Sequence, residues 1–159
     1  MYTWLLYVHL ASVAGFLLAH GSAAAMSFAL RRQHGSDGVR ALLDQSLLFA
    51  PVTYVFLLLI VASGVALGFA GHWWATGWIW VSLAVLVLVS GVMIGLGMPY
   101  NALRQALGSP RGRGGAESAP PGPPEEVRRA TAATRPVTTA LVGVVALAVL
   151  LWLMTIKPF

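Results

Sequence analysis

The chain has 159 residues, of which 58% are hydrophobic and only 9% are charged, and its formal net charge is +5. A soluble domain carries about a quarter of its residues as charged side chains, so this composition excludes one and predicts a membrane protein. The basic residues lie between apolar runs, which excludes nucleic acid as the expected partner. No cysteine is present, which excludes disulfides, thiolate metal sites and iron–sulfur clusters.

Four apolar runs each supply the ~20 residues that cross a bilayer core. The first extends from Tyr2 to about Leu30, and because no Lys or Arg precedes it we interpret it as a retained helix, not a cleaved secretory signal. The second ends near Ala70 and begins with residues 39–49, whose pattern predicts a helix that enters the membrane obliquely. Pro51 predicts a bend in this span.

The third run extends from about Trp78 to Tyr100 and follows a short loop that is rich in tryptophan. Tryptophan is enriched where a membrane meets water. The tryptophans of this region therefore predict an aromatic belt at the surface, made of Trp73, Trp74, Trp78 and Trp80.

Between Gly108 and Pro124, ten of seventeen residues are Gly or Pro, a composition that does not build a packed core. We therefore divide the chain into residues 1–107 with three spans, a disordered Gly/Pro-rich tether over 108–136, and a last span within 137–159. Glu125 to Arg135 predict a short surface helix, and the fourth span runs from about Val137 to Ile156.

Positive charge is confined to one side of these spans. That side carries every arginine of the chain: Arg31, Arg32, Arg40, Arg104, Arg111, Arg113, Arg128, Arg129 and Arg135. The other side has only Lys157 and the amino terminus. The positive-inside rule therefore predicts cytoplasmic loops at 31–45 and 101–136, with both termini outside the inner (plasma) membrane.

His9 and His20 are the ionisable residues within the first span, which makes each of them a candidate functional residue. Eleven residues are three helical turns, so the two rings share one face and lie about 16 Å apart along the axis. A simple interpretation is that each imidazole forms a hydrogen bond with a neighbouring helix. The expected partners are Thr53, Tyr54, Ser63 and Ser90.

A second interpretation is axial ligation of haem b, because helical bundles supply imidazole and thioether ligands from facing helices. One helix cannot grip one iron with both histidines, so each needs a partner at its own depth. Met154 is placed to pair with His9, and Met93 or Met98 with His20. His9 and His20 are also the candidate metal ligands.

Two further histidines have simpler interpretations. His72 lies beside Trp73 at the outer surface and is interpreted as an interfacial anchor, and His34 as a solvated loop residue. We find no Ser/His/Asp arrangement, phosphate loop or zinc motif, and predict no catalytic residue.

Small residues predict where helices approach closely. One face of the first span carries Ser12, Gly15, Ala19, Ser22, Ala23 and Met26. The later spans carry the pairs Gly64/Gly68 and Gly91/Gly95, which we interpret as packing positions.

Three segments, YVHLASVAGFLLAHGSAAAMSFALRRQ, WWATGWIWVSL and WLMTIKP, resemble a family of small bacterial integral membrane proteins of unknown function. That family is similar in layout to the copper-resistance protein D group and the membrane-bound protoporphyrinogen oxidases. The resemblance implies that His9 matches a position used for haem or metal. A Trp-containing turn is replaced here by Ala14, Gly15 and Phe16, so no oxidase activity is implied.

The sequence thus predicts an all-α, four-helix transmembrane bundle with up-and-down connectivity. The expected function is a haem-b-binding or redox-associated membrane subunit in contact with lipid and with other membrane subunits or further copies of itself. The alternatives are a cofactor-free accessory subunit of a larger membrane complex and, ranked last, a copper or small-solute permease.

Overall fold

The computed structural model describes residues 1–33, 36–108 and 122–158. The long helices are α1 (Tyr2–Leu30), α2 (Ser36–Ala70), α3 (Gly77–Ala106) and α5 (Pro136–Ile156). A single turn of 3-10 helix, η1 (Trp73–Ala75), joins α2 to α3, and the short helix α4 (Pro124–Ala133) precedes α5. The all-α prediction is confirmed.

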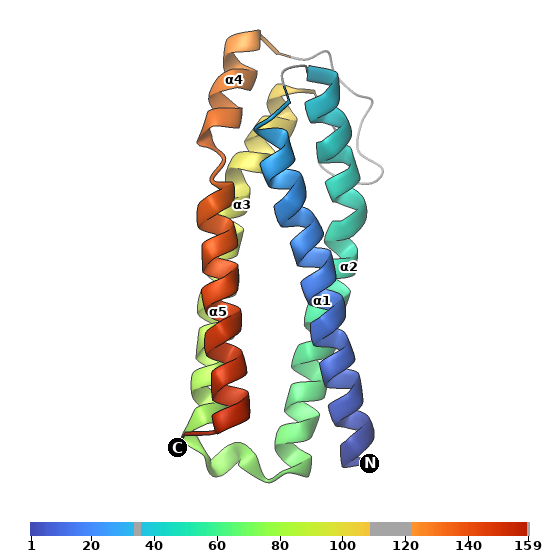
Figure 1. Cartoon of the computed structure of the whole chain (residues 1–159), viewed down its shortest axis with the longest axis vertical. Coiled ribbons are helices and arrows are strands. Elements are labelled where there is room, and N and C mark those ends of the chain that lie inside the picture. The colour runs from blue at the N-terminus through green and yellow to red at the C-terminus, as the bar shows by residue number, and fades with distance from the viewer. Residues whose placement is uncertain (34–35, 109–121, 159) are drawn as a thin grey trace.

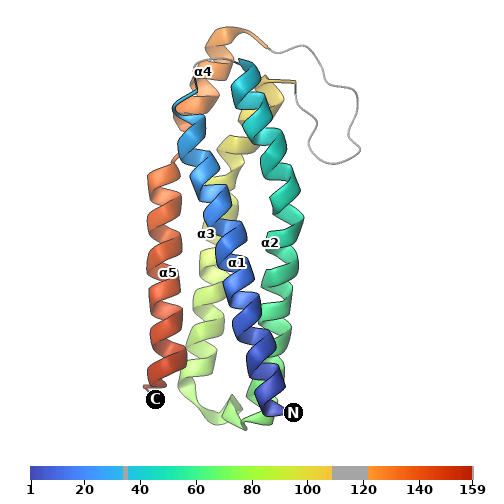
Figure 2. The same ribbon diagram turned by 45° about the vertical axis from the view of Figure 1, so that its right-hand side comes forward.

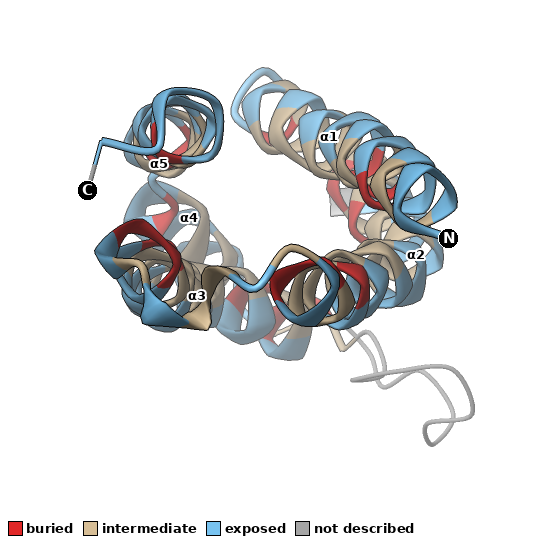
Figure 3. Cartoon of the chain, turned by 90° about the horizontal axis from the view of Figure 1, so that it is seen from below, coloured by how far each residue is buried: buried red, intermediate tan, exposed pale blue. Residues whose placement is uncertain are grey.

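The long helices form an up-and-down bundle made of two pairs. Helices α1 and α2 pack along each other, and α3 packs along α5, which also touches α1 (Figures 1 and 2). Both termini lie at the end of the bundle that holds η1, and α4 lies at the opposite end (Figure 1). The buried residues of α1 and α5 face the neighbouring helices (Figure 3).

Four helical segments are long and apolar enough to cross a membrane, the last of them comprising α4 and α5. Many of their large apolar side chains are exposed in the isolated chain, including Leu18, Leu58, Val87 and Val144. Water does not solvate so continuous an apolar surface, whereas lipid does. The protein is therefore a multi-pass integral membrane protein.

The helices differ in length, and the excess lies at the end that carries α4. Helix α5 has 21 residues and spans about 31 Å, which matches a bilayer core, whereas the 35 residues of α2 span about 52 Å. The extra turns enclose a buried cluster of Leu30, Val39, Leu43, Leu103 and Leu107, on which Val127 and Ala130 of α4 pack. Helix α3 thus continues past its expected end at Tyr100.

Several sequence predictions concern this end of the bundle. Residues 39–49 belong to the same helix as the second span, and α2 continues through Pro51. Within the expected tether, α4 matches the short helix predicted over Glu125 to Arg135. Residues 109–121 of the tether and His34 lie outside the described residues.

Three arginines at this end bind the carbonyl groups of other segments. Arg31 donates to the carbonyl of Thr134, and Arg40 donates to that of Leu107. Arg104 donates to the carbonyl of Leu43 at 3.0 Å and to the Ser46 hydroxyl. The arginines that predicted the topology therefore also join segments that are distant in sequence.

The small residues are used unequally. Ser12 and Ala19 are buried on the predicted face of α1, and Gly15 contacts the ring of Phe56 on α2. A Cβ on Gly64 would lie 3.3 Å from His9 Cε1, so this glycine allows α1 and α2 to approach. A Cβ on Gly91 or Gly95 would meet nothing within 4 Å, so this pair is open within the chain.

Candidate functional site

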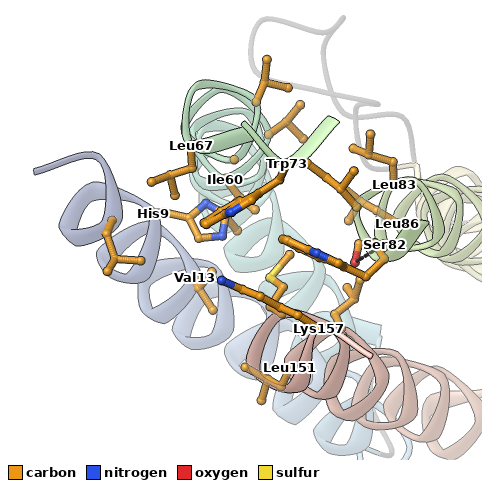
Figure 4. A pocket seen from close by; sticks show the side chains of 18 of the residues that line it. His9, Val13, Ile60, Leu67, Trp73, Ser82, Leu83, Leu86, Leu151 and Lys157 are labelled. Carbon is orange, nitrogen blue, oxygen red and sulfur yellow. Dashed lines mark hydrogen bonds between the residues drawn. The ribbon is translucent and has the colours of Figure 1, made fainter. Parts of the chain in front are cut away.

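A cavity of about 370 Å³ lies between the helices at the end that holds the termini. All four long helices and η1 contribute to its wall, as the side chains in Figure 4 show. Most of the lining is aliphatic or aromatic, and the polar groups are few. They belong to Tyr2, His9, Ser82, Thr155, Lys157 and the indoles of the tryptophans. A mostly apolar cavity with few polar groups is the usual form of a ligand site.

His9 of α1 is the buried ionisable residue of this wall. Its side chain is only 7% exposed, and its Nδ1 atom lies 2.9 Å from the Ser63 hydroxyl on α2. Gly64 leaves room for the imidazole against α2. Of the four hydrogen-bond partners expected from the sequence, Ser63 is thus the one that His9 uses.

The hydrogen bonds of Ser63 favour the tautomer of His9 that carries its proton on Nδ1. The Ser63 hydroxyl donates to the Leu59 carbonyl at 2.5 Å, as serine often does within a helix. Because the hydroxyl has one proton, it accepts the bond from Nδ1–H of His9. Nε2 then carries the lone pair. A histidine whose Nδ1–H is fixed in this way presents Nε2 as a ligand atom.

Met154 of α5 lines the same cavity as His9 of α1. The first predicted His and Met pair thus shares one cavity, on helices that are in contact, and the pairing of the two as ligands stays a prediction. A thioether and an imidazole suit haem iron or a soft metal ion.

The mouth of the cavity is formed by aromatic side chains and one cation. Lys157 Nζ lies 4.1 Å from the centre of the Trp73 ring and 5.5 Å from that of Trp78, and Tyr2 meets Trp73 edge-on. Trp80 alone of the four tryptophans is an exposed surface residue, whereas Trp73, Trp74 and Trp78 line the cavity. The sequence analysis missed this role, although Lys157 was visible as the only cationic side chain on its side.

His20 and Met93 both approach Gly143 of α5, deeper toward the arginine-rich end. A Cβ on Gly143 of α5 would lie 3.2 Å from His20 Nε2 and 3.5 Å from Met93 Cε, so both side chains approach this glycine. Phe16 stacks on the His20 ring, with centroids 5.5 Å apart. Met98, the alternative partner, is 66% exposed, which favours Met93.

The remaining residues do not extend either site. His72 is exposed, has a left-handed backbone with φ of 55°, and precedes η1. Within residues 1–33, 36–108 and 122–158, no cluster of three or more His, Cys, Asp or Glu side chains is placed to hold a metal ion.

Comparison with known proteins identifies no relative of this chain. No protein-family model matches it, and neither the curated proteins nor the solved structures contain a match. The resemblance described from the sequence therefore stays a hypothesis, and the functional argument rests on the cavity and its residues.

Proposed function

We propose that this protein is a haem-b-binding membrane subunit with His9 as an axial ligand in the cavity. The observation that supports the proposal is the state of His9. It is buried in the wall of an apolar cavity, and Ser63 holds Nδ1–H so that Nε2 is left for a ligand. Bundles that bind haem use such histidines from facing helices.

The residues of the cavity fit this group. The volume lies within the usual range of cofactor sites, about 300–1,000 Å³. The aliphatic and aromatic wall suits a flat apolar macrocycle, and His9 and Met154 are the residues that would hold its iron. When bound, haem would supply one-electron transfer. The protein would contribute orientation, a dry environment and exclusion of water.

His20 and Met93 form the second ligand pair in this proposal. Their approach to Gly143 supports the pairing, and their position three helical turns from His9 would place a second centre at another depth. Neither of the two cavities described for this chain includes His20 in its lining. His9 is therefore the better supported ligand.

The proposed orientation places the arginine-rich end in the cytoplasm and the cavity near the outer face of the inner membrane. The concentration of arginine at one end of the bundle supports this orientation. An electron partner would then meet the haem from the outer side or within the membrane.

The second candidate is a cofactor-free accessory subunit of a larger membrane complex, or of an oligomer of this chain. Gly91 and Gly95 on α3 favour this candidate, because no other part of the described chain packs against them and small residues allow a helix of another subunit to approach. The copper or small-solute permease stays the last alternative, because one narrow bundle needs further copies to form a pathway.

The deciding experiment is an absorption spectrum of the detergent-purified protein, oxidised and then reduced with dithionite, after expression with haem precursor. We expect a Soret band and a reduced α-band in the wild type, both lost in His9→Ala. His72→Ala, which changes an exposed histidine, is the matched control and should keep both. If both bands were lost in His20→Ala and kept in His9→Ala, the haem would be bound by His20 and Met93 instead.

A colourless wild-type protein that is folded by circular dichroism would overturn the haem proposal. If such a protein also co-purified with other membrane proteins in fixed stoichiometry, the accessory-subunit function would replace it.

A further inference from the structure

Lys157 is the polar group at the mouth of the cavity, and its charge is not neutralised by the described acidic residues. These are Asp37, Asp44, Glu125 and Glu126, and they lie on the segments at the opposite end of the bundle. The partners of the Lys157 ammonium group near the cavity are the rings of Trp73 and Trp78. A cation–π contact holds an ammonium group in place without cancelling its charge.

Lys157 stands at a backbone position where glycine would be favoured, which suggests that its side chain is needed there. Lys157 ends α5 with φ of 48° and ψ of 62°, a left-handed conformation in which glycine is favoured. The backbone N–H of Lys157 still binds the carbonyl of Leu153, as in a glycine cap. A lysine in this position turns the chain and directs the amine to the cavity, where Figure 4 shows it beside the aromatic side chains.

The cavity therefore has a positively charged end, at Lys157, and a largely apolar interior. His9 is buried in the wall, aliphatic residues such as Val13, Leu86 and Leu150 make up much of the rest of the lining, and the cation is at the exposed end. An amphipathic molecule fits such a cavity in one orientation, with its apolar body inside and its negative group at the amine.

We infer that Lys157 binds a carboxylate of the ligand at the mouth of the cavity, while His9 binds the same ligand further in. This inference rests on the proposed function, because haem b carries two propionate groups at one edge of an otherwise apolar ring. Lys157 would then fix the orientation of the haem, with the propionates toward the outer face. It is a binding residue and takes no part in electron transfer.

The test compares haem b with its dimethyl ester, in which both propionates are neutral. Full-length protein expressed without haem precursor is titrated with each compound in detergent, and binding is followed by the Soret band. We expect the wild type to bind haem on the order of tenfold more tightly than the ester. Lys157→Met should bind both equally, because the charge partner is gone, and Lys157→Arg should keep the preference.

Arg135→Gln is the control for charge attraction at a distance, since Arg135 is an exposed cation at the other end of the bundle. It should leave the preference unchanged. Equal binding of haem and ester by the wild type, or a preference that survives in Lys157→Met, would overturn the role of Lys157 and leave His9 ligation standing. No binding of either compound would overturn both proposals.

Discussion

The Nδ1 atom of His9 and the hydroxyl oxygen of Ser63 lie 2.9 Å apart and join α1 to α2 inside the bundle. The contact satisfies one nitrogen of an imidazole that lines the cavity. The same bond thus serves the packing of two helices and the preparation of a ligand atom.

Ser63→Ala should lower the stability of the protein by about 1 kcal/mol, because Nδ1–H of His9 loses its acceptor in a water-poor interior. The measurement is reversible unfolding in mixed micelles with increasing dodecyl sulfate. Ser90→Ala is the matched control, since the Ser90 hydroxyl bonds the carbonyl of Leu86 in its own helix. Equal losses in the two variants would show that the bond between helices contributes nothing.

Gly64→Leu should destabilise the bundle by about 1–3 kcal/mol, because a side chain there would push the His9 ring away from α2. Gly91→Leu is the matched change at a glycine that faces open space, and we expect an effect within about 0.5 kcal/mol. Both are measured by unfolding in mixed micelles. A larger loss of stability in Gly91→Leu than in Gly64→Leu would contradict our distinction between glycines that pack against a neighbouring helix and glycines that face open space.

Much of this fold was predictable because the membrane imposes it. Apolar runs of sufficient length predicted the spans, and α1, α5 and the end of α2 lie near their expected limits. Up-and-down connectivity and depth were enough to expect His9 and Met154 in the wall of one cavity and His20 and Met93 beside Gly143, where the structure has them; that these residues bind a cofactor stays a prediction. Residues at equal depth on neighbouring helices meet when their faces point inward.

The parts that the sequence did not predict depend on side-chain packing. The extension of α3 to Ala106 is short and contains polar residues, so its hydropathy resembles that of a loop. It is held as a helix by the packing of Leu103 and Leu107 in the buried cluster. The turn of Trp73 and Trp78 onto the cavity follows from η1 and the contact with Lys157. No pattern in a single sequence encodes contacts between such distant residues.

Arg104→Gln should loosen the arginine-rich end by about 1–2 kcal/mol, because Leu43 and Ser46 lose a charged donor that spans two helices. Thermal unfolding and protease accessibility of the loop after α1 provide the measurement. Arg129→Gln, which changes an exposed arginine of α4, should leave both unchanged. Equal proteolysis of the two variants would contradict a role for Arg104 in joining α2 to α3.

The orientation in the membrane is testable with reporters fused to the full chain. Alkaline phosphatase folds only outside the cytoplasm, so we expect it to be active after Phe159 and inactive when inserted after Gly115. Green fluorescent protein should show the reverse pattern. The physical reason is that all nine arginines lie in the sequence segments that flank or join the spans on one side, which resist translocation, while Lys157 is the only cationic side chain on the other. A phosphatase that is active after Gly115 and inactive after Phe159 would invert the topology. The cavity and Lys157 would then face the cytoplasm, and any electron partner would have to be sought there.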